Sequence, residues 1–150
     1  MQRAERALTW HIYGYDIIRD DAFLNKYNVC FTDVDTIIRE CDFISLHLPL
    51  TQETRHILNK ENLKRAKSNL IIVNTARGGL LDEDALYELL KERKLYGLGL
   101  DVFEQEPPQN SKLLTLPNVI VSSHTAASTQ EAINAMSRMA VENLICSLEA

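Results

Sequence analysis

Residues 70–79 read LIIVNTARGG, an apolar run that ends in a polar segment with two glycines. Leu70 to Val73 is apolar at every position, as in a central parallel strand that helices cover on both faces. The acidic triplet Asp82-Glu83-Asp84 follows, and it suits the first turn of a helix. The buried stripe of that helix would be Ala85, Leu86, Leu89 and Leu90, with Lys91, Arg93 and Lys94 near its end. This region predicts a strand, a loop and a helix of an α/β sheet.

Short apolar runs alternate with helical segments on both sides of this region. The predicted strands are His11 to Tyr15, Phe43 to Leu48, Leu70 to Asn74, Leu98 to Val102 and Val119 to Ser122. The other predicted helices are the tail containing Ala4, Ala7 and Leu8, the segment Asp33 to Glu40 with Asp33 or Asp35 as N-cap, and a long helix opened by the capping box Ser128-Thr129-Gln130-Glu131. The alternation predicts a Rossmann-like, doubly wound parallel sheet.

Composition restricts the partners of the chain. Its 150 residues are 45% hydrophobic and 25% charged, as in an ordinary globular domain, and the net charge is −5 with acids and bases interleaved. That pattern lacks the basic surface that nucleic acids require, and no apolar run approaches the roughly 20 residues that span a bilayer. The first residues do not resemble a secretion signal. We therefore expect neither nucleic acid nor membrane as a partner.

The cysteines and histidines show no metal-binding spacing. Cys30, Cys41 and Cys146 are odd in number and far apart, so we expect free thiols that serve as small core residues in a reducing cytoplasm. No two histidines have the spacing of metal ligands, and we predict no metal site.

Asp16 ends the first predicted strand, where the second strand of a Rossmann unit carries an acid for the adenosine ribose. The glycine loop of such a unit precedes the acid by about 20 residues, which here places it before Met1. Gly97-Leu98-Gly99 has Val102 where a third glycine should stand and leads into a strand, so it indicates a tight approach to that strand. We expect the first strand and the glycine loop to be missing.

Chemically versatile side chains follow three separate strands. Arg77 follows the first of these strands, Asp101, Glu104 and Glu106 follow the second, and His124 follows the third. Each has a plain structural interpretation: a surface arginine in a turn, a solvated acidic turn before prolines, and a structural histidine. Because parallel strands end at one edge, however, these side chains can converge on one crevice. There a guanidinium can bind a carboxylate, and a carboxylate beside an imidazole favours the protonated form that a general acid needs.

Five blocks, residues 14–16, 41–51, 74–79, 100–108 and 124–129, resemble in order the D-isomer-specific 2-hydroxyacid dehydrogenases, most of all those like phosphoglycerate dehydrogenase. The resemblance implies an NAD-dependent oxidoreductase that transfers a hydride between a D-2-hydroxy acid and NAD. It implies that Arg77 binds the carboxylate of the 2-oxo acid and polarises its carbonyl, that Glu106 orients His124, and that His124 exchanges the substrate proton.

The resemblance also implies an NAD site. Its residues would be Tyr15, Asp16, His47, Leu48 and Pro49 on the adenosine side, and Thr75, Ala76, Arg77, Asp101, His124 and Ala126 on the nicotinamide side. Asp16 favours NAD over NADP, because a 2′-phosphate would meet its charge, although Arg19 leaves NADP open.

The departures from the family concern completeness. The family's substrate domain has no counterpart here, and Ser123 replaces a proline common before the histidine. We expect residues 1–150 to form a partial NAD-binding domain that is weak or inactive alone, whose long C-terminal helix packs on the domain and helps form a homodimer or other self-association. The alternative is a non-catalytic module that senses NAD(H) or binds a partner. Which 2-hydroxy acid is used is not indicated, since the absent domain builds most of the pocket for its side chain.

Overall fold

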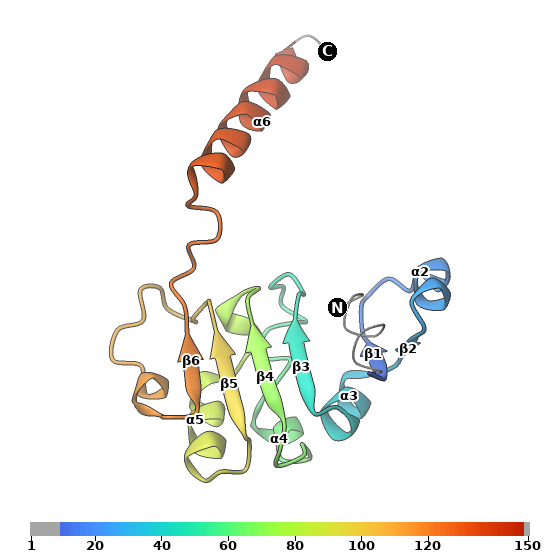
Figure 1. The fold of residues 1–150 in the computed structure, drawn as a ribbon, viewed down its shortest axis with the longest axis vertical. Helices are drawn as coiled ribbons and strands as arrows, with labels where there is room; N and C mark the ends of the chain where they lie inside the picture. Colours follow the sequence, from blue (N-terminus) through green and yellow to red (C-terminus); the bar gives the residue numbers. More distant parts are fainter. Residues whose placement is uncertain (1–9, 149–150) are drawn as a thin grey trace.

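The computed structural model describes residues 10–148 and shows a parallel α/β fold, as predicted (Figure 1). Strands β1 (Ile12–Gly14) and β2 (Val29–Phe31) form one sheet, and β3 (Phe43–Leu46), β4 (Ile71–Asn74), β5 (Gly97–Leu100) and β6 (Val119–Val121) form a second sheet in that order. All neighbours run in parallel. The α-helices are α2 (Asp21–Lys26), α3 (Val34–Glu40), α4 (Lys60–Leu63), α5 (Glu83–Lys91) and α6 (Gln130–Leu148), with 3-10 turns η1 (Gly78–Leu80) and η2 (Lys112–Thr115).

The strands fall into two sheets for a topological reason. In the Rossmann strand order 3-2-1-4-5-6, the first strand lies between the second and the fourth. Here β1, which ends at the acid Asp16, corresponds to the second strand, and β3 corresponds to the fourth. No strand lies between them in residues 10–148, so β1 and β3 share no hydrogen bonds and each sheet has an open edge.

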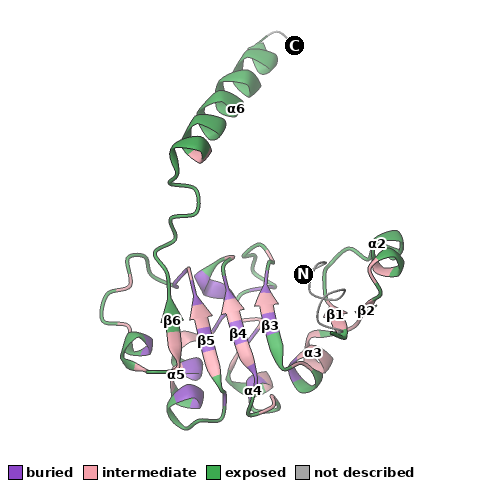
Figure 2. Cartoon of the chain, viewed as in Figure 1, coloured by how far each residue is buried: buried purple, intermediate pink, exposed green. Residues whose placement is uncertain are grey.

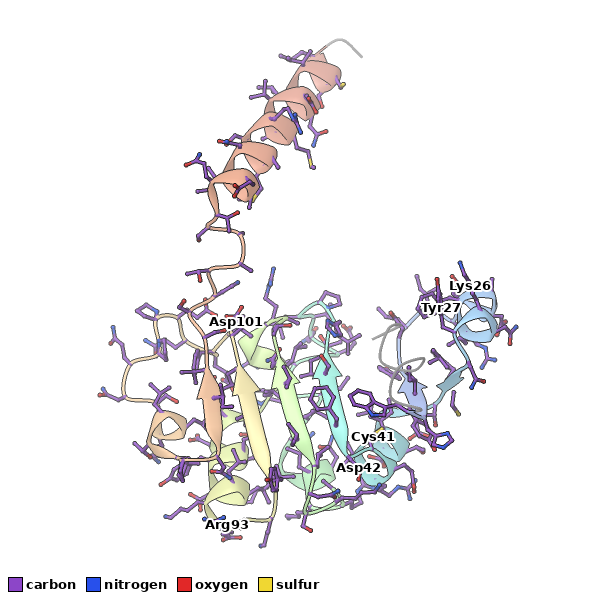
Figure 3. All side chains as sticks on the ribbon, viewed as in Figure 1. Lys26, Tyr27, Cys41, Asp42, Arg93 and Asp101 are labelled. Carbon is purple, nitrogen blue, oxygen red and sulfur yellow. The ribbon has the colours of Figure 1, made fainter. Side chains whose placement is uncertain are left out.

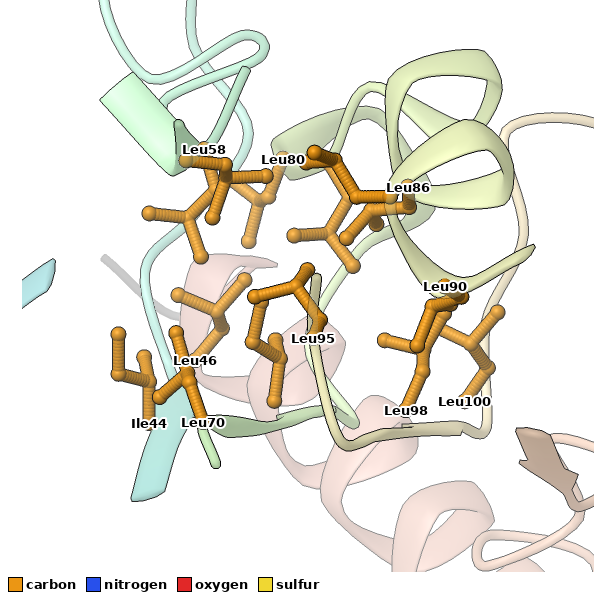
Figure 4. Close-up of a cluster of buried hydrophobic side chains, with 14 of the residues drawn as sticks. Ile44, Leu46, Leu58, Leu70, Leu80, Leu86, Leu90, Leu95, Leu98 and Leu100 are labelled. Atoms are coloured by element: carbon orange, nitrogen blue, oxygen red, sulfur yellow. The ribbon is translucent and has the colours of Figure 1, made fainter. Parts of the chain in front are cut away.

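One face of the four-stranded sheet carries the core. Alternate strand residues such as Ile72 and Leu98 point to this face and are buried. The predicted stripe of α5 covers them, and all four of its members, Ala85, Leu86, Leu89 and Leu90, are buried as expected. Figure 4 shows these leucines meeting those of the strands and of the segment around Leu58. Asp82 fixes the start of α5, because its carboxylate accepts the Ala85 N–H at 3.0 Å.

The opposite face of this sheet is open. Ile120 on β6 is 78% exposed, and a hollow of about 670 Å³ lies over this face, lined mainly by apolar residues of β4, β5 and β6. Gly97 and Gly99 lie on it as part of β5, which supports the interpretation that this glycine pair belongs to a strand. The hollow is away from the carboxyl ends of the strands.

Helix α6 does not pack on the rest of the chain, contrary to prediction. It stands clear of the sheet (Figure 1), and Figure 2 shows it exposed along nearly all its length. The connecting segment, residues 122–129, is exposed throughout, and α6 itself has no buried residue. The predicted capping box is also wrong: the helix begins at Gln130, and it is the Thr129 hydroxyl that accepts the Ala132 N–H, at 3.2 Å.

Several short elements escaped prediction, and one prediction about thiols was wrong. Strand β2 and helices α2 and α4 were not anticipated. Of the cysteines expected in the core, Cys30 and Cys146 are exposed, because they lie on an edge strand and on the free helix, and only Cys41 is partly buried. Burial raises the pKa of the Cys41 thiol.

The predicted helix tail around Ala4, Ala7 and Leu8 lies outside the described residues. Between residues 10 and 148, no helix combines the length and apolarity needed to cross a bilayer.

Candidate active site

The predicted catalytic residues follow the carboxyl ends of β4, β5 and β6, which share one edge of the sheet. Figure 3 marks this edge by the label of Asp101, the first residue after β5. Arg77 lies three residues beyond β4 and His124 lies three residues beyond β6. Open parallel sheets bind ligands at this edge.

Glu106 and His124 are in direct contact. The Glu106 Oε2 atom lies 2.8 Å from His124 Nδ1, and Glu106 Oε1 accepts the Phe103 N–H at 3.1 Å. A carboxylate only accepts hydrogen bonds, so Nδ1 carries the hydrogen, and within residues 10–148 Nε2 forms no hydrogen bond. The hydrogen bond from His124, followed by that from Phe103, lowers the pKa of Glu106.

The Asp101 side chain fixes the backbone of His124 by hydrogen bonding. Its Oδ1 atom accepts the His124 N–H at 2.9 Å and also the Ser122 hydroxyl. The Ser122 bond, and then the His124 N–H, lower the pKa of Asp101. His124 has a φ of +51°, a left-handed conformation that is uncommon for a non-glycine residue and often marks functional sites. The Asp101 bonds offset the cost of this conformation.

Arg77 is positioned by the buried Asn74. The Asn74 amide donates to the Arg77 carbonyl at 2.8 Å, and its oxygen accepts the Ala76 N–H at 3.0 Å. The exposed guanidinium donates to the Ala76 carbonyl at 2.7 Å. Within residues 10–148 it forms no hydrogen bond or ion pair with Glu106 or His124, so the structure brings those two together and leaves Arg77 on the neighbouring loop.

A second hollow joins the predicted adenosine residues. It has a volume of about 210 Å³, and the ends of β1 and β3 line it with Tyr15, Asp16, His47 and Leu48 among others. Pro49 lies just beyond this lining, and its carbonyl accepts the Thr54 hydroxyl at 2.7 Å. The lining also includes Tyr13 and Gly14 of β1 and Phe43 to Leu46 of β3, so the hollow occupies the gap where the first strand of the Rossmann order would lie. Its apolar surface therefore does not by itself indicate a ligand.

The remaining predicted cofactor residues, Thr75, Ala76 and Ala126, lie on loops at the same edge of the sheet. Thr75 and Ala126 are exposed, and Ala76 is partly buried. Nothing in their contacts distinguishes a cofactor role from that of an ordinary loop residue.

Two residues that hold the site, Asn74 and Ser122, were not predicted to have a role. Asn74 has no exposed surface although it is polar, and it ends the most apolar strand. A polar residue at the end of an apolar run was the available signal, because a buried amide needs partners, and the nearest are the backbone groups of the following loop. Ser122 carried no such signal, since its partner Asp101 is 21 residues away.

Comparison with known proteins identifies the family of the chain. Residues 1–126 match the family described as D-isomer specific 2-hydroxyacid dehydrogenase, NAD binding domain. The chain is 50% identical over 134 residues to hydroxypyruvate reductase of Thermotoga maritima, covering 86% of this chain and 43% of that protein. It is 46% identical over 140 residues to D-3-phosphoglycerate dehydrogenase of Methanocaldococcus jannaschii, covering 93% of this chain and 27% of that protein.

The fold is shared with solved members. D-Lactate dehydrogenase of Aquifex aeolicus, solved with NAD and lactic acid, superposes with a TM-score of 0.86 at 30% identity, covering 99% of this chain and 49% of the other. The chain thus spans less than half the length of each of these relatives. It belongs to the D-isomer specific 2-hydroxyacid dehydrogenases and corresponds to their NAD-binding domain.

Proposed function

We propose that this chain provides the cofactor-binding and proton-transfer half of an NAD-dependent oxidoreductase that interconverts a D-2-hydroxy acid and its 2-oxo acid. The observation that carries the proposal is the 2.8 Å contact between Glu106 and His124 at the carboxyl edge of the sheet. It leaves His124 Nε2 free at the edge where open α/β sheets bind ligands. An imidazole held in this way is suited to general acid–base chemistry.

Each residue would have a distinct role. The Arg77 guanidinium would bind the substrate carboxylate by two parallel hydrogen bonds and draw electron density from the adjacent carbonyl. During reduction, His124 would donate the proton on Nε2 to the carbonyl oxygen, and during oxidation it would take that proton back. Glu106 would stabilise the imidazolium form. Bound NADH would supply the hydride, from C4 of its nicotinamide, to the carbonyl carbon.

The adenosine side supports NAD rather than NADP. Asp16 stands at the end of β1, where its carboxylate can accept hydrogen bonds from ribose hydroxyls and would repel a 2′-phosphate. Arg19, the cation that could have offset this repulsion, forms an ion pair with Asp21 at 2.7 Å and lies over the ring of Phe31. Asp101 and the loop residues Thr75, Ala76 and Ala126 would face the nicotinamide.

The substrate would be a small 2-oxo acid. The similar proteins carry the names hydroxypyruvate reductase and D-3-phosphoglycerate dehydrogenase, and their substrates share the carboxylate that Arg77 would bind. The residues at this edge would recognise only the carboxylate that these substrates share. Selectivity among side chains would come from outside residues 1–150.

A second function, a module that binds NAD(H) without turnover, has one feature in its favour. The site is open: the His124 side chain is 48% exposed, and the Arg77 guanidinium donates to the Ala76 carbonyl. Binding without the competence to turn over substrate would fit these features.

We also propose that the chain self-associates. An apolar stripe on α6, formed by Ile133, Met136, Met139 and Leu144, is exposed to solvent, and so is the apolar face of the four-stranded sheet. Contiguous apolar surface of this kind commonly marks a protein interface.

Calorimetric titration of the chain with NADH, followed by an assay of NADH oxidation with hydroxypyruvate, pyruvate and 3-phosphohydroxypyruvate, tests the proposal. We expect little or no turnover from the chain alone. In a longer enzyme that contains it, we expect turnover that the His124→Asn variant abolishes while its NADH affinity stays unchanged. Binding without turnover of any of the three acids by the longer enzyme as well would favour the sensing module. Turnover that survives His124→Asn would remove His124 from proton transfer.

A further inference from the structure

Glu104 lies in the same loop as Glu106 but faces away from His124. Its Oε1 atom is 2.9 Å from Nε2 of His56, and its Oε2 atom is 4.0 Å from the Arg55 guanidinium. The side chains of Glu104 and His56 are 31% and 34% exposed, so this contact is partly shielded from water. His56 is 48 residues away in sequence, and it belongs to the segment between β3 and α4. The pair therefore joins two segments that no strand or helix connects.

The backbone of Glu104 is also held. Its N–H donates to Glu83 Oε1 at 2.7 Å, at the first turn of α5. A Cβ added to Gly78 would overlap the backbone of Phe103 and Glu104, so the loop after Arg77 lies directly against this segment. The His56 N–H in turn donates to the Gly79 carbonyl at 2.8 Å. Three loops at the edge of the sheet thus meet at Glu104.

This arrangement carries an electrostatic cost. Burial, together with the charges of Glu104 and Asp84, raises the pKa of Glu83, although the hydrogen bond from the Glu104 backbone opposes the change. Two acidic side chains are therefore kept close to one another, and His56 and Arg55 both contact Glu104. A solvated acidic turn would have no need of such partners.

The held segment leads directly to the catalytic pair. Phe103 is buried at 8% exposure, and its N–H donates to Glu106 Oε1, while the other oxygen of Glu106 contacts His124. His124 itself lies on an exposed segment, so its orientation depends on Asp101 and Glu106. Any displacement of residues 103–104 would move Glu106 relative to His124.

We propose that Glu104 is a positioning residue: through His56 and Glu83 it anchors residues 103–106 so that Glu106 stays within hydrogen-bonding distance of His124. The Glu104 side chain contacts neither Glu106 nor His124. It acts on Glu106 through the backbone of residues 103–106. The consequence for catalysis rests on the proposed function, whereas the mechanical coupling from Glu104 to Glu106 does not.

The test is a carbon-13 NMR titration of the Glu106 carboxyl group in the 150-residue chain. In Glu104→Ala, and equally in His56→Ala, we expect the pKa of Glu106 to rise toward its ordinary value, because the bond from His124 loosens. Glu104→Gln keeps an oxygen that can accept from His56, and it should restore much of the wild-type behaviour. Glu88→Ala is the control, since Glu88 is exposed on α5 and its side chain makes no hydrogen bond within residues 10–148.

The outcomes separate the two proposals. A Glu106 titration in folded Glu104→Ala and His56→Ala that superimposes on the wild type overturns the positioning role, whatever the NADH measurements show. A raised pKa of Glu106 in both variants supports it even if the chain has no turnover. Should Glu104→Ala fail to fold, His56→Ala decides, because it leaves the sequence of residues 101–106 unchanged.

Discussion

The body of the molecule, β3 to β6 with α4 and α5, and the arm, residues 122–148, are built in opposite ways. The body buries its leucines between sheet and helices, whereas the arm has no buried residue (Figure 2). The candidate site straddles the boundary between them. Arg77 and Glu106 lie on loops fixed to the body, and His124 lies on the arm.

The two sides of the site are therefore held by different interactions. On the body side, the loops are positioned by packing and by buried groups such as Asn74. On the arm side, the orientation of His124 depends on the hydrogen bonds that it donates to Asp101 and Glu106. Packing changes should therefore alter stability, and hydrogen-bond changes should alter the site with little effect on the fold.

Replacing one buried leucine of the body should have the largest effect. Leu86, fully buried in α5, leaves a cavity in Leu86→Ala, and we expect a loss of about 2–5 kcal/mol in the free energy of unfolding. Leu144→Ala makes the same change on α6, where the side chain is 60% exposed, and should cost less than about 1 kcal/mol. Urea unfolding measures both, and equal losses would show that the arm packs like the body.

A side chain added at Gly78, between the loop after β4 and the loop after β5, should have the next largest effect on stability. Gly78→Ala forces its new Cβ into the backbone of Phe103 and Glu104, so we expect a loss of about 1–3 kcal/mol. Gly97→Ala is the matched control, because its Cβ would meet the Asn118 carbonyl only at 3.5 Å. Urea midpoints of the two variants give the comparison, and an undisturbed Gly78→Ala would mean that the two loops can separate freely.

The sequence predicted the body better than the periphery because the body has periodic patterns. Apolar runs located β3 to β6, and the spacing of leucines located the buried face of α5. Strand β2 has only three residues and α4 has four, too few for any periodicity to show. The prediction that α6 packs on the domain failed for another reason. The apolar stripe of the helix is present, but a sequence pattern does not reveal which surface, if any, covers it.

The site was predictable only in part. The family resemblance paired Glu106 with His124, and the structure shows them in contact, while their catalytic roles remain predictions. The contact of His56 with Glu104 joins residues 48 positions apart and follows no spacing rule, so only the folded chain reveals it. Open alternatives were also resolved: Asp33, rather than Asp35, caps α3 by accepting the Thr36 N–H at 2.7 Å.

Removing the imidazole should change titration more than stability. In His124→Ala, Glu106 loses its main hydrogen bond, so its pKa should rise toward the ordinary carboxyl value. Because the folded-state pKa is lowered in the wild type, the bond stabilises the fold above the unfolded carboxyl pKa, and this contribution disappears as the pH falls through the lowered value. Both groups are exposed, so the stability difference at neutral pH should be small.

Carbon-13 NMR titration of the glutamate carboxyls checks this, with urea midpoints at neutral and acidic pH as the second measurement. Glu53 serves as an internal control, since its pKa is lowered by the Thr51 hydroxyl, 2.8 Å away and outside the site. A Glu106 titration that is unchanged in His124→Ala would show that the bond does not persist in solution.

The smallest effect on the fold should come from a charge on the arm. Met136 is 52% exposed in the stripe of α6, so Met136→Lys should change the free energy of unfolding of the dilute chain by less than about 0.5 kcal/mol. The same change should weaken self-association, which sedimentation equilibrium measures, because the charge would have to lose water at an apolar interface. Asn134→Lys adds an equal charge two positions away, on the opposite side of the helix, and should leave association unchanged. A wild-type chain that is monomeric at all concentrations would show that the stripe does not bind a second copy. If Met136→Lys destabilises the monomer itself, α6 packs on the body, and the arm and the body are not built differently.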